Sequence, residues 1–328
     1  TKKISKPIKI ICTLGPSSYP KKILKKLKAE GVNIFRINLS HTPKNQILKK
    51  IKYLKSQNIK NICIDTEGAQ VRTSKVKKKI FLKKNFLINL KIGDDFSNNK
   101  IINFHPNFDI TTCKKNTFFF IGFDDLVLKV TKIIKNKKIL VAKVINSGYL
   151  ESNKGVHISK NVNLDSLTEK DKFAIKLAIK HGVKYYAMSF VNRGSDIDTI
   201  RKLISKSFLI SKIETNNALN NLNEIMRKSD ALLIDRGDLS RYVPIEYIPV
   251  EQERIIKSAL KKKKPVYVAT NLLENMVTHS QPTRAESHDI FSTIRQGASG
   301  LVLAAETAIG KNPLSCVKFL KKSIRIFE

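Results

Sequence analysis

Short apolar runs alternate with amphipathic stretches along most of this 328-residue chain. The runs are rich in Ile, Val and Leu and have the length of buried strands, whereas the stretches between them repeat apolar residues with the period of a helix. Strands are predicted at 8–14, 32–38, 61–65, 184–190, 208–213, 230–235, 265–270 and 299–304. Helices are predicted at 19–29, 44–56, 169–181, 196–205, 251–263 and 284–296. Strands that alternate with helices predict a parallel α/β fold, and eight such units predict a TIM (β/α)8 barrel.

One long segment, 73–154, breaks this alternation after the third predicted strand. It contains β-like runs separated by Asn, Gly and Lys, and it has no long helical pattern. The runs lie at 80–83, 86–90, 117–121, 126–130 and 139–144. We therefore predict a small all-β domain at 73–154, inserted into a barrel that is formed by 1–72 and 155–328. Without the insert, the barrel has about the 250 residues that are typical of this fold.

Polar and charged residues gather at the C-terminal ends of the predicted strands, where barrels place their active sites. They are Thr13, Arg36, Asn38, Ser40, Asp65, Thr66, Ser189, Lys212, Glu214, Asp235, Asp238, Thr270 and Glu306. Any one of them is most simply a solvated loop residue, but the whole set at strand ends indicates a site. Lys212 and Glu214 are two residues apart, so a strand directs both to one face. A cation beside metal-binding carboxylates suits phosphoryl transfer, in which charge on phosphate oxygens must be neutralised.

The formal net charge of +35 allows two interpretations. A strongly basic chain is typical of proteins that bind nucleic acid or anionic surfaces. Alternatively, the charge reflects compositional bias, because the lysines are scattered over most predicted helices and no aromatic-plus-basic platform or nucleic-acid motif accompanies them. We favour compositional bias and expect no nucleic-acid partner.

The chain shows no sign of export or of membrane insertion. No window approaches the roughly 18 apolar residues of a membrane span, and the basic N-terminus runs directly into the first predicted strand. Its four cysteines, Cys12, Cys63, Cys113 and Cys316, form no CxxC pair. We expect free thiols in a reducing cytoplasm.

Seven segments together match one enzyme family, in the same order along the chain. They are 9–18 (KIICTLGPSS), 36–41 (RINLSH), 65–66 with Arg72, 211–214 (SKIE), 236–239 (RGDL), 282–286 (PTRAE) and 306–308 with 310–311. On these segments, which cover nearly the whole predicted barrel, the chain resembles pyruvate kinase. The resemblance implies a glycolytic kinase, a transferase that moves the phosphoryl group of phosphoenolpyruvate to ADP and yields pyruvate and ATP. It also implies that 73–154 is a mobile lid.

The family's C-terminal regulatory domain has no counterpart in this sequence. We therefore expect no allosteric control by sugar phosphates, and a homodimer or a monomer rather than a tetramer.

The resemblance also implies roles for individual residues. Lys212 matches the lysine that stabilises the moving phosphoryl group, and Arg36 matches the arginine that grips phosphate. Thr270 matches the threonine implicated in protonating the enolate through water. The backbone around Gly237 and Asp238, which opens a helix, matches the site of the substrate carboxylate. These residues make up the expected catalytic and substrate-binding set.

Metal and nucleotide sites follow from the same resemblance. Glu214 and Asp238 match ligands of a divalent ion, and oxygen ligands suit Mg²⁺ or Mn²⁺. The expected ligands of a monovalent cation, K⁺ in the family, are Asn38, Ser40, Asp65 and Thr66. Arg72 and Lys154 match nucleotide contacts near the lid hinge.

The chain also departs from the family at positions around this set. At the hinge it reads 65–72 DTEGAQVR, where the family usually has a lysine, a proline and an acidic residue in place of Glu67, Ala69 and Gln70. The residue at the Gln70 position affects potassium dependence in the family. Asp235 replaces an alanine beside the metal site, and Ala304 replaces a serine of a suspected proton relay. These departures leave two alternatives open: a different acceptor or carbon–carbon lyase chemistry on the same barrel, and a non-catalytic regulatory relative.

Overall fold

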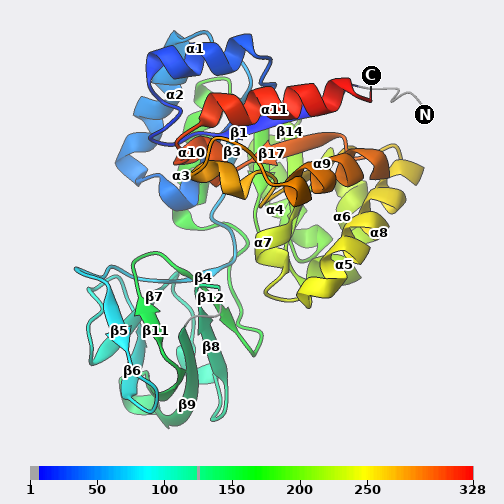
Figure 1. Cartoon of the computed structure of the whole chain (residues 1–328). Coiled ribbons are helices and arrows are strands. Elements are labelled where there is room, and N and C mark those ends of the chain that lie inside the picture. The colour runs from blue at the N-terminus through cyan, green and yellow to red at the C-terminus, as the bar shows by residue number, and fades with distance from the viewer. Residues whose placement is uncertain (1–6, 124–125, 328) are drawn as a thin grey trace. The chain divides into compact units, whose positions relative to one another are not determined.

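The protein, described by a computed structural model over residues 7–123 and 126–327, divides into two compact units. One unit joins the chain up to Gly68 to the chain from Glu169 onward, and the other is Ala69–Thr168. The second unit extends beyond the predicted insert of 73–154 on both sides. Figure 1 shows that the first unit contains nearly all the helices and that the second is built mainly of strands.

The first unit is a closed barrel of eight parallel strands. They are β1 (Lys9–Thr13), β2 (Ile34–Asn38), β3 (Ile62–Asp65), β13 (Tyr185–Met188), β14 (Phe208–Ile213), β15 (Ala231–Asp235), β16 (Val266–Ala269) and β17 (Gly300–Leu303). Neighbours pair in the order β1-β17-β16-β15-β14-β13-β3-β2, so each strand lies beside the next in the sequence and β17 closes onto β1. Each predicted strand contains one of these eight. The predicted barrel is therefore confirmed.

The interior of this barrel is filled by side chains from all eight strands. The cluster consists of Ile11, Ile34, Cys63, Ala187, Ile210, Ala231, Leu233, Tyr267, Ala269 and Val302, all at most 1% exposed. Because side chains alternate between the two faces of a strand, the residue two positions further along also points inward. This alternation carries Arg36, Asp65, Ser189, Lys212 and Asp235 to the inner side of the barrel, above the apolar cluster.

Helices surround these strands in Figure 1. The six predicted helices correspond to α1 (Lys21–Ala29), α2 (Ile47–Ser56), α3 (Glu169–Lys180), α4 (Gly194–Ile204), α8 (Ile248–Lys261) and α9 (Arg284–Gln296). Five more were not predicted in detail: α5 (Asn216–Asn220), α6 (Leu222–Lys228), α7 (Arg236–Leu239), α10 (Ala305–Ala308) and α11 (Pro313–Arg325). Local sequence fixes the ends of α9, where Thr283 and Glu286 form a capping box and Gly297 takes a left-handed conformation with φ 104°.

The second unit contains a closed barrel of seven strands and a separate two-stranded sheet. The barrel order is β10 (Ile139–Asn146), β6 (Leu87–Ile92), β7 (Ile101–His105), β4 (Val71–Thr73), β12 (Gly155–Ile158), β8 (Phe118–Ile121) and β9 (Leu126–Ile134). The small sheet pairs β11 (Gly148–Leu150) with β5 (Ile80–Leu82). The core of the second unit is apolar and includes Phe104 stacked on Phe119, with 5.5 Å between the ring centroids. The pattern missed β4, β7, β11 and β12, which are short or interrupted by Gly, Asn and His.

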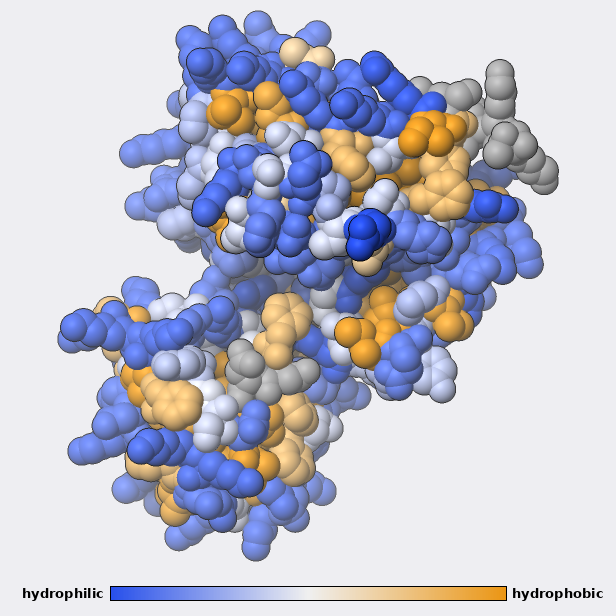
Figure 2. Space-filling model, viewed as in Figure 1, coloured by the Kyte–Doolittle hydropathy of each residue, from blue (hydrophilic) through white to orange (hydrophobic). Residues whose placement is uncertain are grey.

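The visible surface of each unit is largely hydrophilic, with apolar side chains scattered among charged ones (Figure 2). This matches a chain with 62 Lys and Arg residues against 27 Asp and Glu residues. In the part of the chain that the structure describes, no helix is both long and apolar enough to span a membrane.

Candidate active site

A buried cluster of charged residues lies at the C-terminal ends of the barrel strands. Lys212 lies in β14 and Glu214 directly follows it, and Asp235 is the last residue of β15. Arg36 comes from β2 and Asp65 from the end of β3. At most 8% of each of these five residues is exposed. Buried charges are costly unless they are paired, so their mutual contacts decide what the cluster does.

Lys212 is at the centre of this cluster. Its Nζ lies 3.0 Å from Glu214 Oε1, 3.4 Å from Asp235 Oδ2 and 3.5 Å from Asp65 Oδ2. It also donates to Ser189 Oγ at 3.2 Å. Burial by itself lowers the pKa of Lys212, but Asp65, Glu214 and Asp235 together raise that pKa above its ordinary value. The site therefore holds a permanently charged ammonium group.

Glu214 is the most deeply buried carboxylate of the group, at 0% exposure. Burial is the main cause that raises the pKa of Glu214 to about 8. The positive charge of Lys212 lowers this pKa, but the negative charges of Asp235 and Asp238 raise it again. Glu214 Oε2 accepts a hydrogen bond from Phe190 N at 2.6 Å. A carboxylate in this position is stabilised in its charged form by any further cation.

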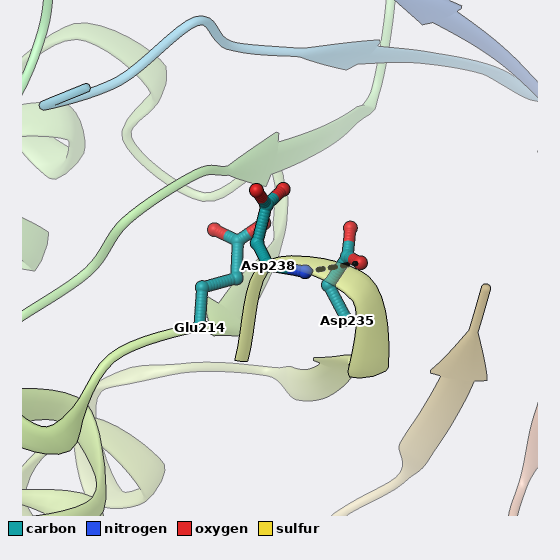
Figure 3. Close-up of side chains that lie close together, drawn as sticks. All are labelled: Glu214, Asp235 and Asp238. Carbon is teal, nitrogen blue, oxygen red and sulfur yellow. Dashed lines mark hydrogen bonds between the residues drawn. The ribbon is translucent and has the colours of Figure 1, made fainter. Parts of the chain in front are cut away.

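Glu214, Asp235 and Asp238 bring one carboxylate oxygen each to within 4.8 Å of one another. Figure 3 shows the carboxylates of Glu214, which follows β14, and of Asp238, which lies in α7, close together with Asp235 beside them. Asp235 is the N-cap of α7 and accepts from Asp238 N at 3.5 Å. Three oxygen donors from buried or half-buried carboxylates fit a hard divalent cation such as Mg²⁺ or Mn²⁺. Sequence reasoning identified Glu214 and Asp238 as ligands and noted Asp235 only as a departure.

Arg36 brings a second cation into the cluster. Its Nε lies 2.8 Å from Asp65 Oδ2, and Asp65 Oδ1 accepts from Ser189 Oγ at 3.0 Å. Arg36 Nη1 is buried and has no hydrogen-bond partner among the described residues. A buried donor without a partner is costly, and an anionic oxygen of a ligand would satisfy it.

Thr270 follows β16 in an unusual backbone conformation, with φ 81°. This conformation costs about 1–3 kcal/mol for a residue other than glycine, so neighbouring groups must hold it. The Thr270 hydroxyl donates to Asp235 Oδ1 at 2.7 Å. The Thr270 carbonyl accepts from Arg236 Nε at 3.1 Å and from Nη2 at 2.6 Å. Arg236 is itself anchored by Asp289, 2.8 Å from Nη1.

The residues predicted to bind a monovalent cation lie at the ends of two adjacent strands. Asn38 and Asp65 are partners in the register of β2 and β3. Asn38 Oδ1 accepts from Ser40 N at 3.0 Å, and the Thr66 carbonyl accepts from Ser189 Oγ at 2.7 Å. The four side chains are therefore brought to one edge of the barrel, and their role in cation binding stays a prediction.

The two predicted nucleotide contacts, Arg72 and Lys154, belong to the second unit. They lie on neighbouring strands, because Arg72 in β4 is in register with Gly155 at the start of β12. Arg72 Nη1 donates to the Asn153 carbonyl at 3.1 Å, and Lys154 Nζ pairs with Glu151 at 2.8 Å. The backbones of Arg72 and Lys154 are thus adjacent within this unit, and the contact of their side chains with a nucleotide stays a prediction.

Comparison of the sequence with known proteins identifies the family of this chain. The family described as "Pyruvate kinase, barrel domain" matches residues 5–317. The chain belongs to the pyruvate kinase family. It is 36% identical to pyruvate kinase of Thermotoga maritima over 96% of the chain and 69% of that relative. It is 34% identical to the chloroplastic pyruvate kinase isozyme G of Nicotiana tabacum, over 95% of the chain and 57% of that relative.

A third relative, pyruvate kinase of Dictyostelium discoideum, is 32% identical over 98% of the chain and 66% of its own length. The chain thus spans between 57% and 69% of the length of these three pyruvate kinases.

One departure from the pyruvate kinase pattern, Glu67, is accommodated by a partner elsewhere in the barrel unit. Glu67 Oε1 accepts from Lys170 Nζ at 2.7 Å, and the same ammonium donates to the Leu39 carbonyl at 2.6 Å. Leu39 opens the 3-10 turn Leu39–His41, and Glu67 follows the Asp65–Thr66 pair. Lys170 therefore ties together the two loops that carry the predicted monovalent-cation ligands.

Sequence reasoning gave no role to two residues of this candidate site. Ser189 contacts Lys212, Asp65 and the Thr66 carbonyl. Asp235 contacts Lys212, Thr270 and the start of α7. The signal in the sequence that could have identified both is the same. Each is a polar residue at the C-terminal end of a barrel strand, two positions after an apolar residue that points inward.

Proposed function

We propose that the chain transfers the phosphoryl group of phosphoenolpyruvate to ADP and releases pyruvate and ATP. One observation carries this proposal: the charged Lys212 ammonium is buried among carboxylates suited to a divalent cation. Asp65 links this ammonium to Arg36, because its Oδ2 is close to both cations. Such an arrangement places positive charge where it can stabilise the negative charge of a phosphoryl group during transfer. Membership of the pyruvate kinase family supports the same reaction.

In the proposed mechanism, Lys212 and Arg36 each interact with a different part of the phosphoryl group. Lys212 neutralises charge that develops as the phosphoryl group leaves the enolate oxygen. Arg36 binds a phosphate oxygen through its buried Nη1, since Nε is already paired with Asp65. Glu214 and Asp238 would hold Mg²⁺ or Mn²⁺, with Asp235 beside them. The ion would supply Lewis-acid stabilisation of negative charge on the substrate.

The start of α7 is the proposed contact for the substrate carboxylate. Gly237 is required there by space, because a Cβ at this position would come within 2.8 Å of Thr270 Cγ2. Its backbone can therefore approach a ligand closely. The Asp235 carboxylate already caps the N–H of Asp238, so we assign the substrate carboxylate mainly to the backbone of Gly237.

Thr270 is the proposed group for the second half of the reaction, in which the enolate of pyruvate gains a proton on carbon. Its hydroxyl lies next to the lysine and carboxylate cluster through the 2.7 Å contact with Asp235. We infer that Thr270 holds a water molecule close to the enolate carbon rather than giving up its own proton. K⁺, bound by Asn38, Ser40, Asp65 and Thr66, would complete the charge balance beside Arg36.

The nucleotide is proposed to approach the barrel unit near an open cavity of about 560 Å³. The cavity is lined by Pro16, Tyr19, Pro20, Gln46, Lys49, Lys50 and Tyr53. Lys50 Nζ lies 5.0 Å from the centre of the Tyr19 ring. Within the described chain, the buried Tyr19 hydroxyl has no hydrogen-bond partner. Aromatic faces for a base and lysines for phosphates support this assignment.

The proposal is tested by measuring pyruvate formation from phosphoenolpyruvate, ADP and Mg²⁺, with and without K⁺. We expect turnover in the wild type and its loss in Lys212→Met, which removes the transition-state charge. The exposed Lys257→Met is the matched control, because Lys257 pairs with Glu253 on the surface of α8. Turnover of Lys212→Met equal to that of the wild type would remove the basis of the assignment.

A second candidate is a carbon–carbon lyase or a transfer to another acceptor on the same enolate-stabilising site. Asp235 favours it, because a third carboxylate beside Glu214 and Asp238 changes the charge that a bound substrate meets. Release of pyruvate from a 2-oxo acid with Mg²⁺, but without phosphoenolpyruvate and ADP turnover, would support this candidate over the kinase.

A further inference from the structure

We propose that Asp235 is a positioning residue that fixes the hydrogen-bond direction of the Thr270 hydroxyl. The inference rests on the proposed function and deepens it, because it concerns how Thr270 serves the enolate. Asp235 was singled out in the sequence as an added carboxylate, and its contacts now show what the addition does.

Asp235 is joined to three parts of the site at once. Oδ2 faces the Lys212 ammonium at 3.4 Å, whereas Oδ1 accepts from the Thr270 hydroxyl at 2.7 Å and from Asp238 N at 3.5 Å. Asp235 is 8% exposed, so these contacts are only weakly shared with solvent. A carboxylate that faces an ammonium group has no proton to give and can only accept. The Thr270 hydroxyl is therefore the donor in this pair.

A hydroxyl group has one proton, and Asp235 uses it. The Thr270 oxygen keeps its two lone pairs and so presents an acceptor to the mouth of the barrel. The group that Thr270 holds there must then be a donor, such as a water molecule. Without Asp235 the hydroxyl is free to rotate, and its donor and acceptor directions are no longer set.

The segment that carries Asp235 restrains Thr270 in two further ways. Arg236 donates twice to the Thr270 carbonyl, at 3.1 and 2.6 Å. Gly237 lies so close to Thr270 Cγ2 that no Cβ would fit between them. Three consecutive residues therefore hold the hydroxyl, the carbonyl and the methyl group of a threonine whose φ of 81° is unfavourable. Such restraint is expected where the orientation of the Thr270 hydroxyl is needed for function.

The test is a double-mutant cycle on proton exchange at the methyl group of pyruvate. Exchange in D₂O with Mg²⁺, K⁺ and inorganic phosphate is followed by NMR for the wild type, Asp235→Ala, Thr270→Val and the double variant. We expect each single change to slow exchange by about tenfold or more, as for a disturbed proton-transfer group. If Asp235 acts through Thr270, the double variant is no slower than the slower single variant. Effects that multiply would overturn the inference.

Two further measurements separate positioning from other roles of Asp235. Asp235→Asn keeps an acceptor oxygen, so its exchange rate should stay within about threefold of the wild type; an Asn variant as slow as the Ala variant would contradict the proposal. Mn²⁺ affinity, measured by electron paramagnetic resonance without substrate, should change by less than about threefold in Asp235→Ala. A loss of about tenfold or more would show that Asp235 acts on the metal site, as a ligand or beside one, and would overturn positioning of Thr270 as the explanation.

Asp230→Asn is the matched control, because Asp230 directly precedes β15, at the end opposite Asp235, and pairs with Arg201 at 2.7 Å. It should leave exchange unchanged, and slower exchange would contradict a local role for Asp235. A wild type with neither turnover nor exchange would refute the proposed function together with this inference. Normal turnover with multiplying effects would refute the inference alone.

Discussion

Lys212 should be the main source of stability in the charged cluster as well as its proposed chemical centre. At an effective dielectric constant of about 20, two unit charges 3.0 Å apart attract by about 5 kcal/mol. The contacts at 3.4 and 3.5 Å add comparable attraction, and the desolvation of the ammonium offsets much of the sum. Removing one partner of a buried pair typically costs about 3–5 kcal/mol. We expect Lys212→Met to lose that amount of unfolding free energy near pH 8.

This loss should depend on pH in a defined direction. The pKa of Lys212 is raised in the folded state, so its stabilising effect is constant below about pH 10, the ordinary lysine value. The pKa of Glu214 is raised as well, and without Lys212 it rises further. A carboxyl with a raised folded pKa stabilises the protein fully below its unfolded value of about 4.3, and this effect is lost as pH rises through the folded value. Below about pH 8 the Glu214 carboxyl keeps its proton in both folded proteins, so the deficit of Lys212→Met should be constant from about pH 5 to about pH 7. It should grow above about pH 8, where Glu214 ionises beside Lys212 in the wild type but stays protonated in the variant.

Urea unfolding of the wild type and of Lys212→Met between about pH 6 and about pH 9.5, with and without Mg²⁺, measures this effect. Mg²⁺ should restore part of the deficit, because a cation that binds only the folded cluster stabilises it by mass action. Lys257→Met is the control and should lose less than about 1 kcal/mol, since its ion pair is exposed. A deficit that does not grow above about pH 8, or one no larger than that of the control, would refute the reasoning.

Three further predictions follow from single contacts. In the wild type without metal, stability should fall as pH rises from about 5 to about 8, since the Glu214 pKa is raised to about 8 by burial, and Glu214→Gln should abolish this slope in urea unfolding. Glu67→Lys should place two ammonium groups together beside the Leu39 carbonyl and lower stability by about 1 kcal/mol, whereas Glu67→Gln should cost less. Thr270→Gly should relieve the strain at φ 81°, so its melting temperature should stay close to that of the wild type while turnover of phosphoenolpyruvate falls.

The hydrophobic pattern was sufficient for the barrel because each strand is apolar on both sides and each helix is amphipathic. The same alternation predicted that Lys212 and Glu214 share a face, and their 3.0 Å contact agrees. The second unit was harder, since strands such as β12 contain Gly and His and depend on pairing with distant partners. The Glu67–Lys170 pair joins residues 103 positions apart, so no local pattern could predict it. Asp235 was visible as a departure, but its three contacts come from β14, from the residue after β16 and from α7.

Charge balance connects these observations to the proposed chemistry. Among the described residues of the cluster, Lys212, Arg36 and Arg241 face Asp65, Glu214, Asp235 and Asp238, so one negative charge is left over. Burial raises the pKa of Glu214, and the negative charges of Asp235 and Asp238 raise it further. A divalent cation would reverse the excess negative charge and leave a net positive site for an anionic substrate. Because Asp235 supplies the excess charge, the chain should depend on its divalent cation for substrate binding more than a variant with alanine at this position. Titrating phosphoenolpyruvate affinity against Mg²⁺ in the wild type and in Asp235→Ala tests this, and equal metal dependence in both proteins would contradict the charge argument.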